Sequence, residues 1–355
     1  MMPKVATNKI THSTKQSGVA LIVVMLIVAL VTILAVEMSS RLQLNIARTS
    51  NVKANNQAFW YALGAEQFAK NSLSTLQSLT KDNINLSQPW AQDFEYPVEG
   101  GAITAKLTDL QACFNLNAIH SKPASQQQSG ANNQTNTNNA NTNGNPNNAP
   151  APSQQAFQRL LENYINDSYT VDTIRDALND WVDEDTFPSP FGAEDADYES
   201  LPMPYLPANG PLSHISEVRL LNGVDTAAKN GLLNELKKVM CVLPETNLKI
   251  NVNTITEDNA VVLSALLGDT LQTGIDIVNS RPEEGFDDID DFLTLSEVRA
   301  LSLTPEQTQW FTTTTEYFRL HTTATFQGSQ FRMSTVFKLE SDNVVIINRE
   351  FGGAF

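Results

Sequence analysis

The residues best suited to chemistry form an acidic segment from Asp172 to Glu199. Ten of its residues are Asp or Glu, and Arg175 is its only base. Carboxylates this dense repel one another unless something neutralises them. Several lie among Pro and Gly, and flexible carboxylate loops can supply the roughly six to eight oxygen ligands that Ca²⁺ takes. We therefore expect a calcium site with these candidate ligands: Asp183, Asp185, Glu194, Asp195, Asp197, Asn209 and Glu217.

A plainer interpretation of the acids stays open. Asp183-x-Asp185 is not followed by the acid and glycine that an EF-hand loop has at its next positions, so a solvated acidic surface would have the same composition. A second acidic run, from Asp287 to Asp291, precedes a helix expected near Phe292. Acids favour a helix N-terminus, and we interpret this run as helix capping.

Catalytic patterns are otherwise poor. The histidines are scattered, and the sequence has no H-E-x-x-H, G-x-S-x-G or phosphate-binding loop. Paired carboxylates could serve a glycosidase, but ten acids in one stretch show no division into acid and base. Removing the three lysines of residues 1–18 from 23 basic and 39 acidic residues leaves a formal charge of −19. Such a chain repels phosphate backbones, so we expect neither an enzyme nor a nucleic-acid partner.

The N-terminus carries the longest apolar run of the chain. Val19 to Val36 are apolar apart from Thr32, and the lysine-bearing leader before them ends in Gly18. As a helix this run rises roughly 27 Å, close to the ~30 Å core of a bilayer. A secretory signal is cleaved after its apolar run, whereas the attractive small residue here lies before it. Cleavage after Gly18 would keep the apolar helix on the mature protein; an uncleaved membrane anchor is the alternative.

The remaining elements follow from periodicity and punctuation. Helical spacing continues without Pro, which predicts one helix over residues 19–79. A strand is expected over residues 102–110, and an Asn-rich segment over residues 125–155 is expected to be disordered. Short helices follow, with capping boxes at Thr254 and Thr294 and an N-cap at Thr304. Alternating residues after 317, a turn at Gly328 and a third run at 344–347 predict an antiparallel meander.

This order predicts an α+β fold in which a helical domain is inserted into a helix-plus-sheet domain. The expected divisions are a leader (1–18), a transmembrane helix (19–39), a helix with the first strands (40–120), a disordered loop (121–155), an inserted helical domain (156–310) and a C-terminal sheet (311–355). The only two cysteines, Cys113 and Cys241, are either buried free thiols or one disulfide, which an oxidising compartment would favour.

Several motifs in this order resemble one family. They are Gly18 followed by Val-Ala-Leu-Ile-Val-Val, Cys113-Phe-Asn-Leu-Asn, Asp180-Trp-Val-Asp-Glu-Asp, Gly192-Ala-Glu-Asp-Ala-Asp-Tyr, Cys241-Val-Leu-Pro, and Ile250-Asn-Val-Asn-Thr. The first is similar to the cleavage site of prepilin-type leaders, and the set resembles the K-type minor pseudopilins of type II secretion systems. The resemblance covers nearly the whole chain except the Asn-rich segment.

The resemblance implies a pilin-like long helix on an antiparallel sheet, with a large all-α (SAM-like) insert. It implies cleavage between Gly18 and Val19, N-methylation of Val19, bound calcium, and a bond between Cys113 and Cys241. Most pilin-like chains have Glu at the fifth mature position, where this chain has Val23. An intramembrane carboxylate is costly unless paired, and a subunit at a fibre tip has no subunit above it to pair with.

The function so implied is to cap the pseudopilus tip and help initiate its assembly for export of folded proteins across the outer membrane. The implied partners are the I, J and H types of minor pseudopilin, the major pseudopilin, prepilin peptidase, the inner-membrane assembly platform and membrane lipid. The chain would cross the inner membrane once, with its bulk in the periplasm. The alternative is a membrane-anchored periplasmic calcium-binding or adhesin-like protein that belongs to no fibre.

Overall fold

The computed structural model describes residues 18–80, 82–120, 150–224, 231–341 and 343–352. The leader up to residue 17 and most of the predicted disordered segment, residues 121–149, lie outside the described residues. Helix α2 begins at Pro152, so residues 152–155, which were expected to be disordered, are helical. Pro at the first helical position needs no hydrogen-bond acceptor, and the Gln154 side chain accepts from the Ala151 backbone N–H at 2.9 Å.

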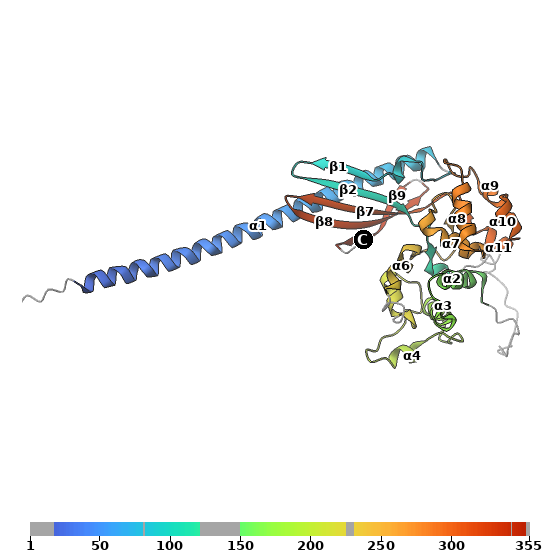
Figure 1. Cartoon of the computed structure of the whole chain (residues 1–355), viewed down its shortest axis with the longest axis horizontal. Coiled ribbons are helices and arrows are strands. Elements are labelled where there is room, and N and C mark those ends of the chain that lie inside the picture. The colour runs from blue at the N-terminus through green and yellow to red at the C-terminus, as the bar shows by residue number, and fades with distance from the viewer. Residues whose placement is uncertain (1–17, 81, 121–149, 225–230, 342, 353–355) are drawn as a thin grey trace, which may run out of the picture.

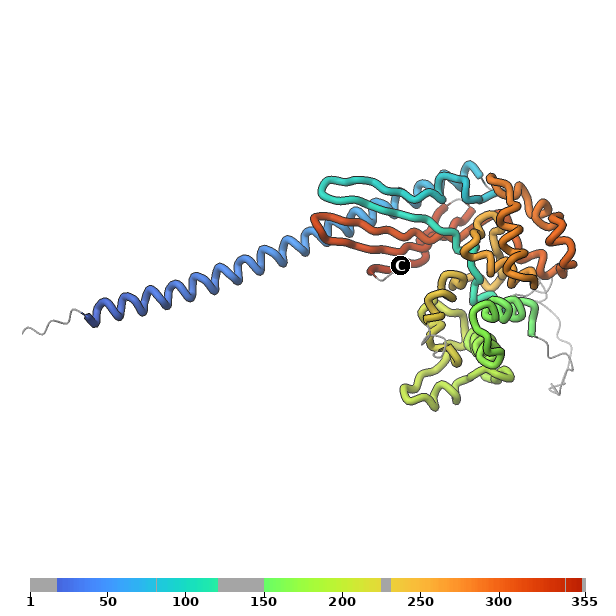
Figure 2. Tube along the Cα trace, in the orientation of Figure 1, coloured from blue at the N-terminus to red at the C-terminus, as the bar shows by residue number. Residues whose placement is uncertain are grey.

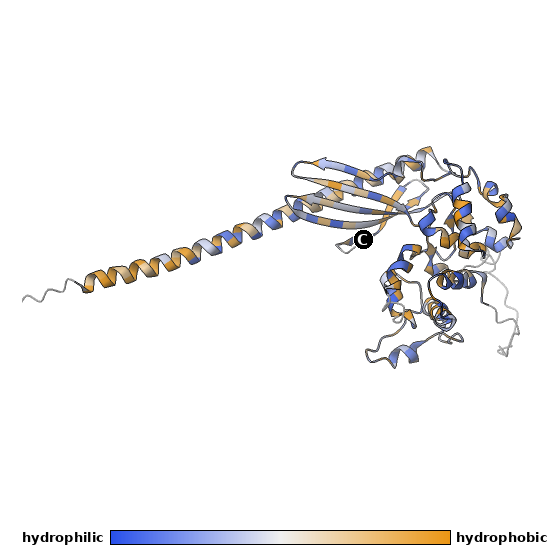
Figure 3. Ribbon diagram, in the orientation of Figure 1, coloured by the Kyte–Doolittle hydropathy of each residue, from blue (hydrophilic) through white to orange (hydrophobic). Residues whose placement is uncertain are grey.

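The first helix, α1, runs from Val19 to Leu79 as the periodicity predicts. Its 61 residues make a helix of roughly 90 Å, whose N-terminal part extends free of the remaining structure (Figure 1). Figure 3 shows that this free part is also the most apolar. Its one polar interruption, Thr32, donates its hydroxyl to the carbonyls of Val28 and Ala29. By length and composition α1 could span a membrane.

Five antiparallel strands form one sheet in the order β1-β2-β7-β8-β9. The strands are β1 (Phe94–Val98), β2 (Gly101–Asp109), β7 (Tyr317–Phe326), β8 (Ser329–Glu340) and β9 (Asn343–Phe351). The β7–β8 turn contains Gln327 and Gly328, both with positive φ, and the latter was predicted as a turn. The predicted C-terminal meander is confirmed, and β2 joins it although more than 200 residues separate β2 from β7.

Helix α1 packs on the sheet through a row of small side chains. Five alanines, at positions 54, 58, 62, 65 and 69, are buried at intervals of three or four residues. Side chains this small let the helix lie close to the strands, where Ile103, Ala324 and Met333 meet them. Two turns later Leu73 and Leu76 pack on Phe318 and Phe337. The helix therefore covers one sheet face with only its C-terminal part.

One charged group is buried in this helix–sheet contact. Glu66 of α1 is fully buried, and its two carboxylate oxygens accept from Nε and Nη2 of Arg349 on β9, both at 2.7 Å. The Thr335 hydroxyl on β8 donates to the same carboxylate at 2.9 Å. This bidentate pair fixes the rotation of α1 on the sheet, because a rotated helix would leave a buried charge unpaired.

The chain between β2 and β7 forms a helical insert at the end of the sheet farthest from the free part of α1 (Figure 1). Its first lobe contains η2 (Leu116–Ala118), α2 (Pro152–Glu162), α3 (Ser168–Val182), α4 (Asp195–Glu199), η4 (Ile215–Leu220) and α6 (Leu232–Val239). Its second lobe contains η5 (Glu257–Asn259), α7 (Ala260–Leu267), α8 (Leu271–Ser280), α9 (Ile289–Leu293), α10 (Ser296–Ala300) and α11 (Pro305–Thr308). A short helix, η1 (Pro89–Ala91), precedes β1.

Two short parallel strand pairs link segments of the insert that are far apart in the sequence. They pair β3 (Phe114–Asn115) with β4 (Met240–Cys241), and β5 (Ile250–Asn251) with β6 (Phe311–Thr312). One apolar core runs through both lobes, and it includes Phe114, Leu116 and Ile119. The insert therefore begins soon after β2 ends at Asp109, before the predicted boundary at residue 120, and it extends through β6.

Two predicted capping boxes are wrong. The N-cap before η5 is Thr256, and the hydroxyl of Thr254 instead donates to the buried carboxylate of Asp109. Thr294 lies at the C-terminus of α9, where its hydroxyl donates to the Asp291 carbonyl at 3.1 Å. The predicted N-cap at Thr304 is confirmed, since its hydroxyl accepts from the Gln307 backbone N–H.

Candidate functional site

Helix α3 positions the acidic segment. Asp167 caps its N-terminus by accepting from the Thr170 backbone N–H at 3.1 Å, and its apolar side buries Ile174, Leu178 and Trp181. The helix ends at Val182, so Asp183 directly follows its C-terminus. The helix dipole disfavours negative charge at that end. The acids after α3 therefore lie where an added cation would be most stabilising.

Three of the predicted ligands converge. Asp183, Asp185 and Glu194 each offer an oxygen, and these oxygens all lie within 4.8 Å of one another. Glu194 is only 5% exposed, yet neither of its carboxylate oxygens has a hydrogen-bond partner among the described residues, and Oδ1 of Asp183 is likewise buried without one. Buried carboxylate oxygens without partners are costly, and a bound cation would remove that cost.

The electrostatics of the group agree with its geometry. Burial, and then the charges of Asp185 and Asp180, raise the pKa of Asp183 to about 6. Burial, and then repulsion from four neighbouring aspartates, raise the pKa of Glu194 to about 7. Both shifts show that the ionised forms are destabilised in the protein alone. Oxygen-only donors of this kind suit a hard divalent cation such as Ca²⁺.

Asn209 is brought next to Asp195 by the chain that returns past α4. The Gly210 backbone N–H donates to the Trp181 carbonyl at 3.1 Å, and Nδ2 of Asn209 lies 3.5 Å from a carboxylate oxygen of Asp195. Its Oδ1 is buried and has no partner among the described residues. Asn209 therefore has a buried amide oxygen without a partner next to Asp195, and its role as a ligand stays a prediction.

Two other predicted ligands, Asp197 and Glu217, accept hydrogen bonds from nearby backbone N–H groups. Asp197 accepts from the Glu194 backbone N–H at 3.0 Å at the N-terminus of α4. Glu217 accepts from the backbone N–H groups of Ser213 and His214 at 3.0 and 2.8 Å, and so caps η4. Neither belongs to the group of converging carboxylates. The structure thus brings together Asp183, Asp185 and Glu194, places Asn209 against Asp195, and uses Asp197 and Glu217 as acceptors for backbone N–H groups.

Asp180 is a functional-site residue that the sequence prediction did not include. It is fully buried, and its carboxylate accepts from both the backbone N–H and the hydroxyl of Ser189. A Cβ at Gly192 would lie 1.8 Å from Oδ2 of Asp180, so only glycine allows this approach. The available signal was spacing: Asp180 lies in the last turn of α3, four residues after Asp176 and three before Asp183.

The predicted N-terminal junction coincides with the start of α1. Gly18 is the N-cap and Val19 the first helical residue. Val23 is exposed on the free apolar part of the helix. Glu37, the first acid after the apolar run, pairs with Arg41 at 2.6 Å. A cut after Gly18 would therefore remove the leader and keep the whole of α1 on the mature protein.

Cys113 and Cys241 form a disulfide, which selects that alternative over two free thiols. The bond lies at the base of the insert, beside the β3–β4 pair. There Asn115 accepts from the Leu243 backbone N–H at 3.0 Å, while Asn117 donates to the carbonyls of Leu212 and Leu243, both at 2.9 Å. The asparagines of the Cys113 motif therefore satisfy buried backbone groups, a role that the sequence pattern did not reveal.

The second acidic run has the capping role predicted for it. Asp288 is the N-cap of α9 and accepts from the Asp291 backbone N–H at 3.0 Å. The helix starts at Ile289, three residues before the expected position.

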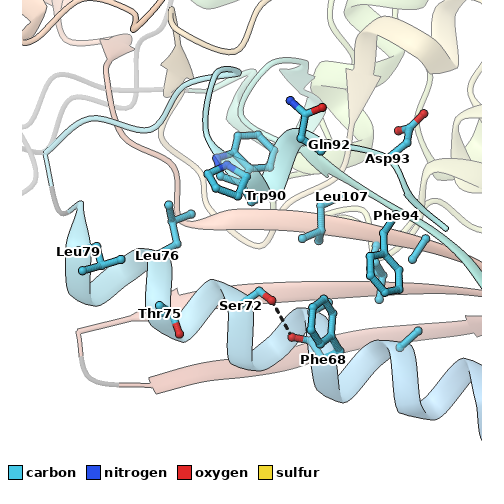
Figure 4. A pocket seen from close by; sticks show the side chains of 15 residues that line it. Phe68, Ser72, Thr75, Leu76, Leu79, Trp90, Gln92, Asp93, Phe94 and Leu107 are labelled. Atoms are coloured by element: carbon cyan, nitrogen blue, oxygen red, sulfur yellow. Dashed lines mark hydrogen bonds between the residues drawn. The ribbon is translucent and has the colours of Figure 1, made fainter. Parts of the chain in front are cut away.

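A groove of about 410 Å³ lies between the C-terminal turns of α1 and the η1–β1 segment (Figure 4). Phe68 of α1 stacks on Phe94 with ring centroids 5.1 Å apart, and Leu76 and Trp90 lie farther along the groove. Phe68 is exposed, as is Trp60 on the same helix. Between them, Gly64 has open space where a side chain would be, which leaves a notch on the helix surface.

A long apolar helix whose far part covers an antiparallel sheet, followed by a large helical insert with a disulfide at its base, defines a pilin-like protein with an elaborated distal domain. Two family models described as "Type II secretion system (T2SS), protein K" match residues 112–245 and 250–314, which are the two lobes of the insert. The chain belongs to the protein K family of type II secretion systems, the K-type minor pseudopilins.

Comparison with known proteins gives matches over nearly the full length. The type II secretion system protein K of Aeromonas hydrophila is 35% identical over 347 residues, covering 96% of this chain and 98% of that protein. Protein K of Klebsiella pneumoniae is 32% identical over 341 residues, covering 95% and 97%. A chain of the solved GspK-GspI-GspJ complex from enterotoxigenic Escherichia coli is 27% identical, with a TM-score of 0.71, covering 86% of this chain and all of that one. These matches do not support the alternative of an anchored protein outside a fibre.

Proposed function

We propose that this minor pseudopilin caps the tip of the pseudopilus and helps to initiate its assembly for export of folded proteins across the outer membrane. The observation that carries the proposal is the position of the insert. The described part of residues 110–316 is gathered at the end of the sheet farthest from the apolar part of α1, with the first lobe turned to one side (Figure 1). In a fibre whose apolar helices all enter from one side, this mass would block another subunit from stacking above.

Fibre length tests the capping role. Cells that lack this chain should make pseudopili that are longer than normal when the major pseudopilin is abundant, because growth is not blocked at the tip. Restoring the chain should return the length to normal. Unchanged fibre length, with labelled chain found along the fibre side rather than at its end, would contradict capping.

The proposed partners are the I- and J-type minor pseudopilins, and the H type and major pseudopilin through them. Support comes from the solved complex that a similar chain forms with GspI and GspJ. On this chain, Trp60, Gly64 and Phe68 lie four residues apart on one exposed side of α1, and they lead into the groove of Figure 4. An aromatic pair flanking a glycine notch suits packing against another helix.

Co-purification of full-length proteins tests this contact. Gly64→Leu fills the notch on the exposed side, where open space should keep the fold intact. We expect it to reduce recovery of the I- and J-type subunits. Gln67→Leu, which adds the same side chain at another exposed position of α1, is the matched control and should not. Equal recovery with both variants would place the contact elsewhere.

We also propose that prepilin peptidase cuts between Gly18 and Val19 and methylates the new amine. The chain would then cross the inner membrane once, with the sheet and insert in the periplasm and the assembly platform beneath it. The 18-residue run after Gly18, apolar apart from Thr32, and the disulfide support this orientation. A mature mass beginning at N-methyl-Val19 is expected, and Gly18→Asp should retain the leader. Normal processing of that variant would contradict the site.

Finally, we propose that Asp183, Asp185, Glu194 and Asn209 hold calcium. The orphaned buried oxygens support the proposal, because they fit a cation and fit little else. Calcium would hold the end of α3, the start of α4 and the returning chain together. No catalytic step is part of this role. Metal analysis of the purified chain should find calcium that Glu194→Gln loses; metal-free wild-type protein after calcium dialysis would contradict the site.

A further inference from the structure

Exposed apolar side chains outside α1 are concentrated in one part of the insert. Of eleven large apolar residues that are exposed among the described residues beyond α1, seven lie between positions 169 and 220. The most exposed are Met203 at 83% and Phe187 at 79%, and Leu206 is 57% exposed. We call these three the apolar tip. They lie on the two loops that flank α4, the part of the first lobe that projects away from the sheet (Figure 2).

Both loops are tied to the rest of the lobe by hydrogen bonds. The first is tied to α3 because Asp176 accepts from the Phe191 backbone N–H at 3.1 Å and Asp180 accepts from Ser189. The second is tied because the Tyr205 hydroxyl donates to the Leu220 carbonyl at 2.7 Å. Their proline residues further restrict the backbone: Pro188, Pro190, Pro202, Pro204 and Pro207.

Anchoring matters because a mobile loop could fold its apolar side chains inward. Here hydrogen bonds hold both loops while Phe187 and Met203 remain exposed to solvent. Such exposure costs free energy in the monomer, and a concentration of large exposed apolar side chains in one region of a soluble domain marks a place of interaction. A preorganised surface also loses less conformational entropy when a partner binds.

The charge around the apolar tip selects its partner. The sequence has no Lys or Arg from residue 176 to residue 218, and the exposed acids Glu184, Asp185, Asp197 and Glu199 lie on the first loop and on α4. An anionic bilayer and a second copy of this tip would both be repelled. A protein surface with an apolar patch bordered by Lys and Arg is complementary in both respects.

We propose that the apolar tip is a docking surface for a protein that presents an apolar patch bordered by Lys and Arg side chains. The surface is separate from α1 and from the groove of Figure 4. It therefore adds a contact beyond those of the proposed fibre partners, and it does not depend on the capping role.

The test uses the full chain in nanodiscs of zwitterionic lipid, with calcium present. The probes are two amphipathic synthetic peptides of equal length, one built from Leu and Lys and the other from Leu and Glu. Fluorescence anisotropy should show binding of the Leu/Lys peptide and none of the Leu/Glu peptide. Phe187→Ser/Met203→Ser should weaken that binding about tenfold or more. Leu271→Ser/Ile347→Ser, which removes two exposed apolar residues elsewhere, is the matched control and should not.

Equal binding of the Leu/Lys peptide to the wild type and the Phe187→Ser/Met203→Ser variant would overturn the proposal, since only net charge would then be at work. Three other results would also overturn it: stronger binding of the Leu/Glu peptide, binding to phosphatidylglycerol vesicles that the same variant loses, or self-association that it loses. Unchanged thermal unfolding of the variant establishes that it is folded. A photo-crosslinker at position 203 in cells should join a peptide that contains Lys or Arg beside apolar residues.

Discussion

Two buried glutamates mark the difference between the halves of this molecule. Glu66, under α1, is fully buried, and Arg349 and Thr335 occupy its oxygens. Glu194, in the insert, is almost as buried, and neither oxygen has a partner among the described residues. A buried charge is stable only when paired. The buried carboxylate of the helix–sheet half is therefore paired within the chain, whereas the one in the first lobe is not, and it is there that we propose a cation.

Removing the disulfide should produce the largest difference in stability between the two halves, because the loop that it closes contains the whole first lobe. Cys113 and Cys241 are 128 residues apart, and in the chain-entropy model a loop of this length is worth about 4–5 kcal/mol. Cys113→Ala/Cys241→Ala should lower the unfolding temperature of the insert far more than that of the helix–sheet half. Differential scanning calorimetry checks this, and an equal loss in both halves would mean that they unfold as one unit.

Removing the buried ion pair of the helix–sheet half should have the next largest effect on stability. Glu66→Gln leaves Arg349 without its anion and should cost about 2–3 kcal/mol, less than the ~3–5 kcal/mol of a fully buried pair because a third of the arginine is exposed. Urea unfolding should show the same loss with and without calcium. Glu235→Gln, which breaks the exposed pair with Lys238, is the control and should cost no more than about 0.5 kcal/mol. A calcium-dependent loss in the Glu66 variant would contradict the division into two halves.

Removing the Glu217 carboxylate, which lies outside the group of converging acids, should lower stability by less. Glu217→Ala removes the acceptor for two backbone N–H groups of η4 and should cost about 0.5–1 kcal/mol. Calcium affinity, measured by isothermal titration calorimetry, should not change. A marked fall in affinity would return Glu217 to the ligand set.

The pH dependence sharpens the same contrast. The pKa values of Asp183 and Glu194 in the folded protein are raised to about 6 and about 7, so the folded state holds protons that the unfolded state has lost. Without calcium, stability should therefore fall as pH rises from about 4 to about 7. Calcium should flatten this fall. Asp109, whose pKa burial raises to about 6, and His321, whose pKa burial lowers to about 4, add a background that calcium does not alter.

Unfolding curves recorded with calcium and with chelator across this pH range isolate the effect of the carboxylate group. Parallel pH profiles in the two conditions would show that the carboxylates titrate without meeting a cation.

Much of the fold follows from local pattern. The ends of α1 could be predicted because Gly18 begins an apolar run and no Pro interrupts the helix, and the strands could be predicted because buried and exposed residues alternate. The pairing of Glu66 with Arg349 could not, because 283 residues separate them and either could have lain in solvent. The capping box at Thr254 failed because its hydroxyl had a better acceptor in the buried Asp109, which no local window contains.

The candidate site divides in the same way. Asp183 and Asp185 were predictable from acid density after a helix, and Glu194 from its loop. Their burial was not predictable, nor was the supporting role of Asp180. Asp197 and Glu217 have the same composition around them as the converging acids, and only the backbone reveals that they cap α4 and η4. Composition therefore indicates a cation site, while three-dimensional packing decides its members.

The central claim is that calcium completes the insert and leaves the helix–sheet half unchanged. The most direct test is calorimetric unfolding of the metal-free full chain as calcium is added. The account predicts that the transition assigned to the insert rises with calcium, that the helix–sheet transition does not move, and that Glu194→Gln abolishes the rise while Glu217→Ala retains it. A chain whose transitions ignore calcium, or shift equally in both halves, would contradict it.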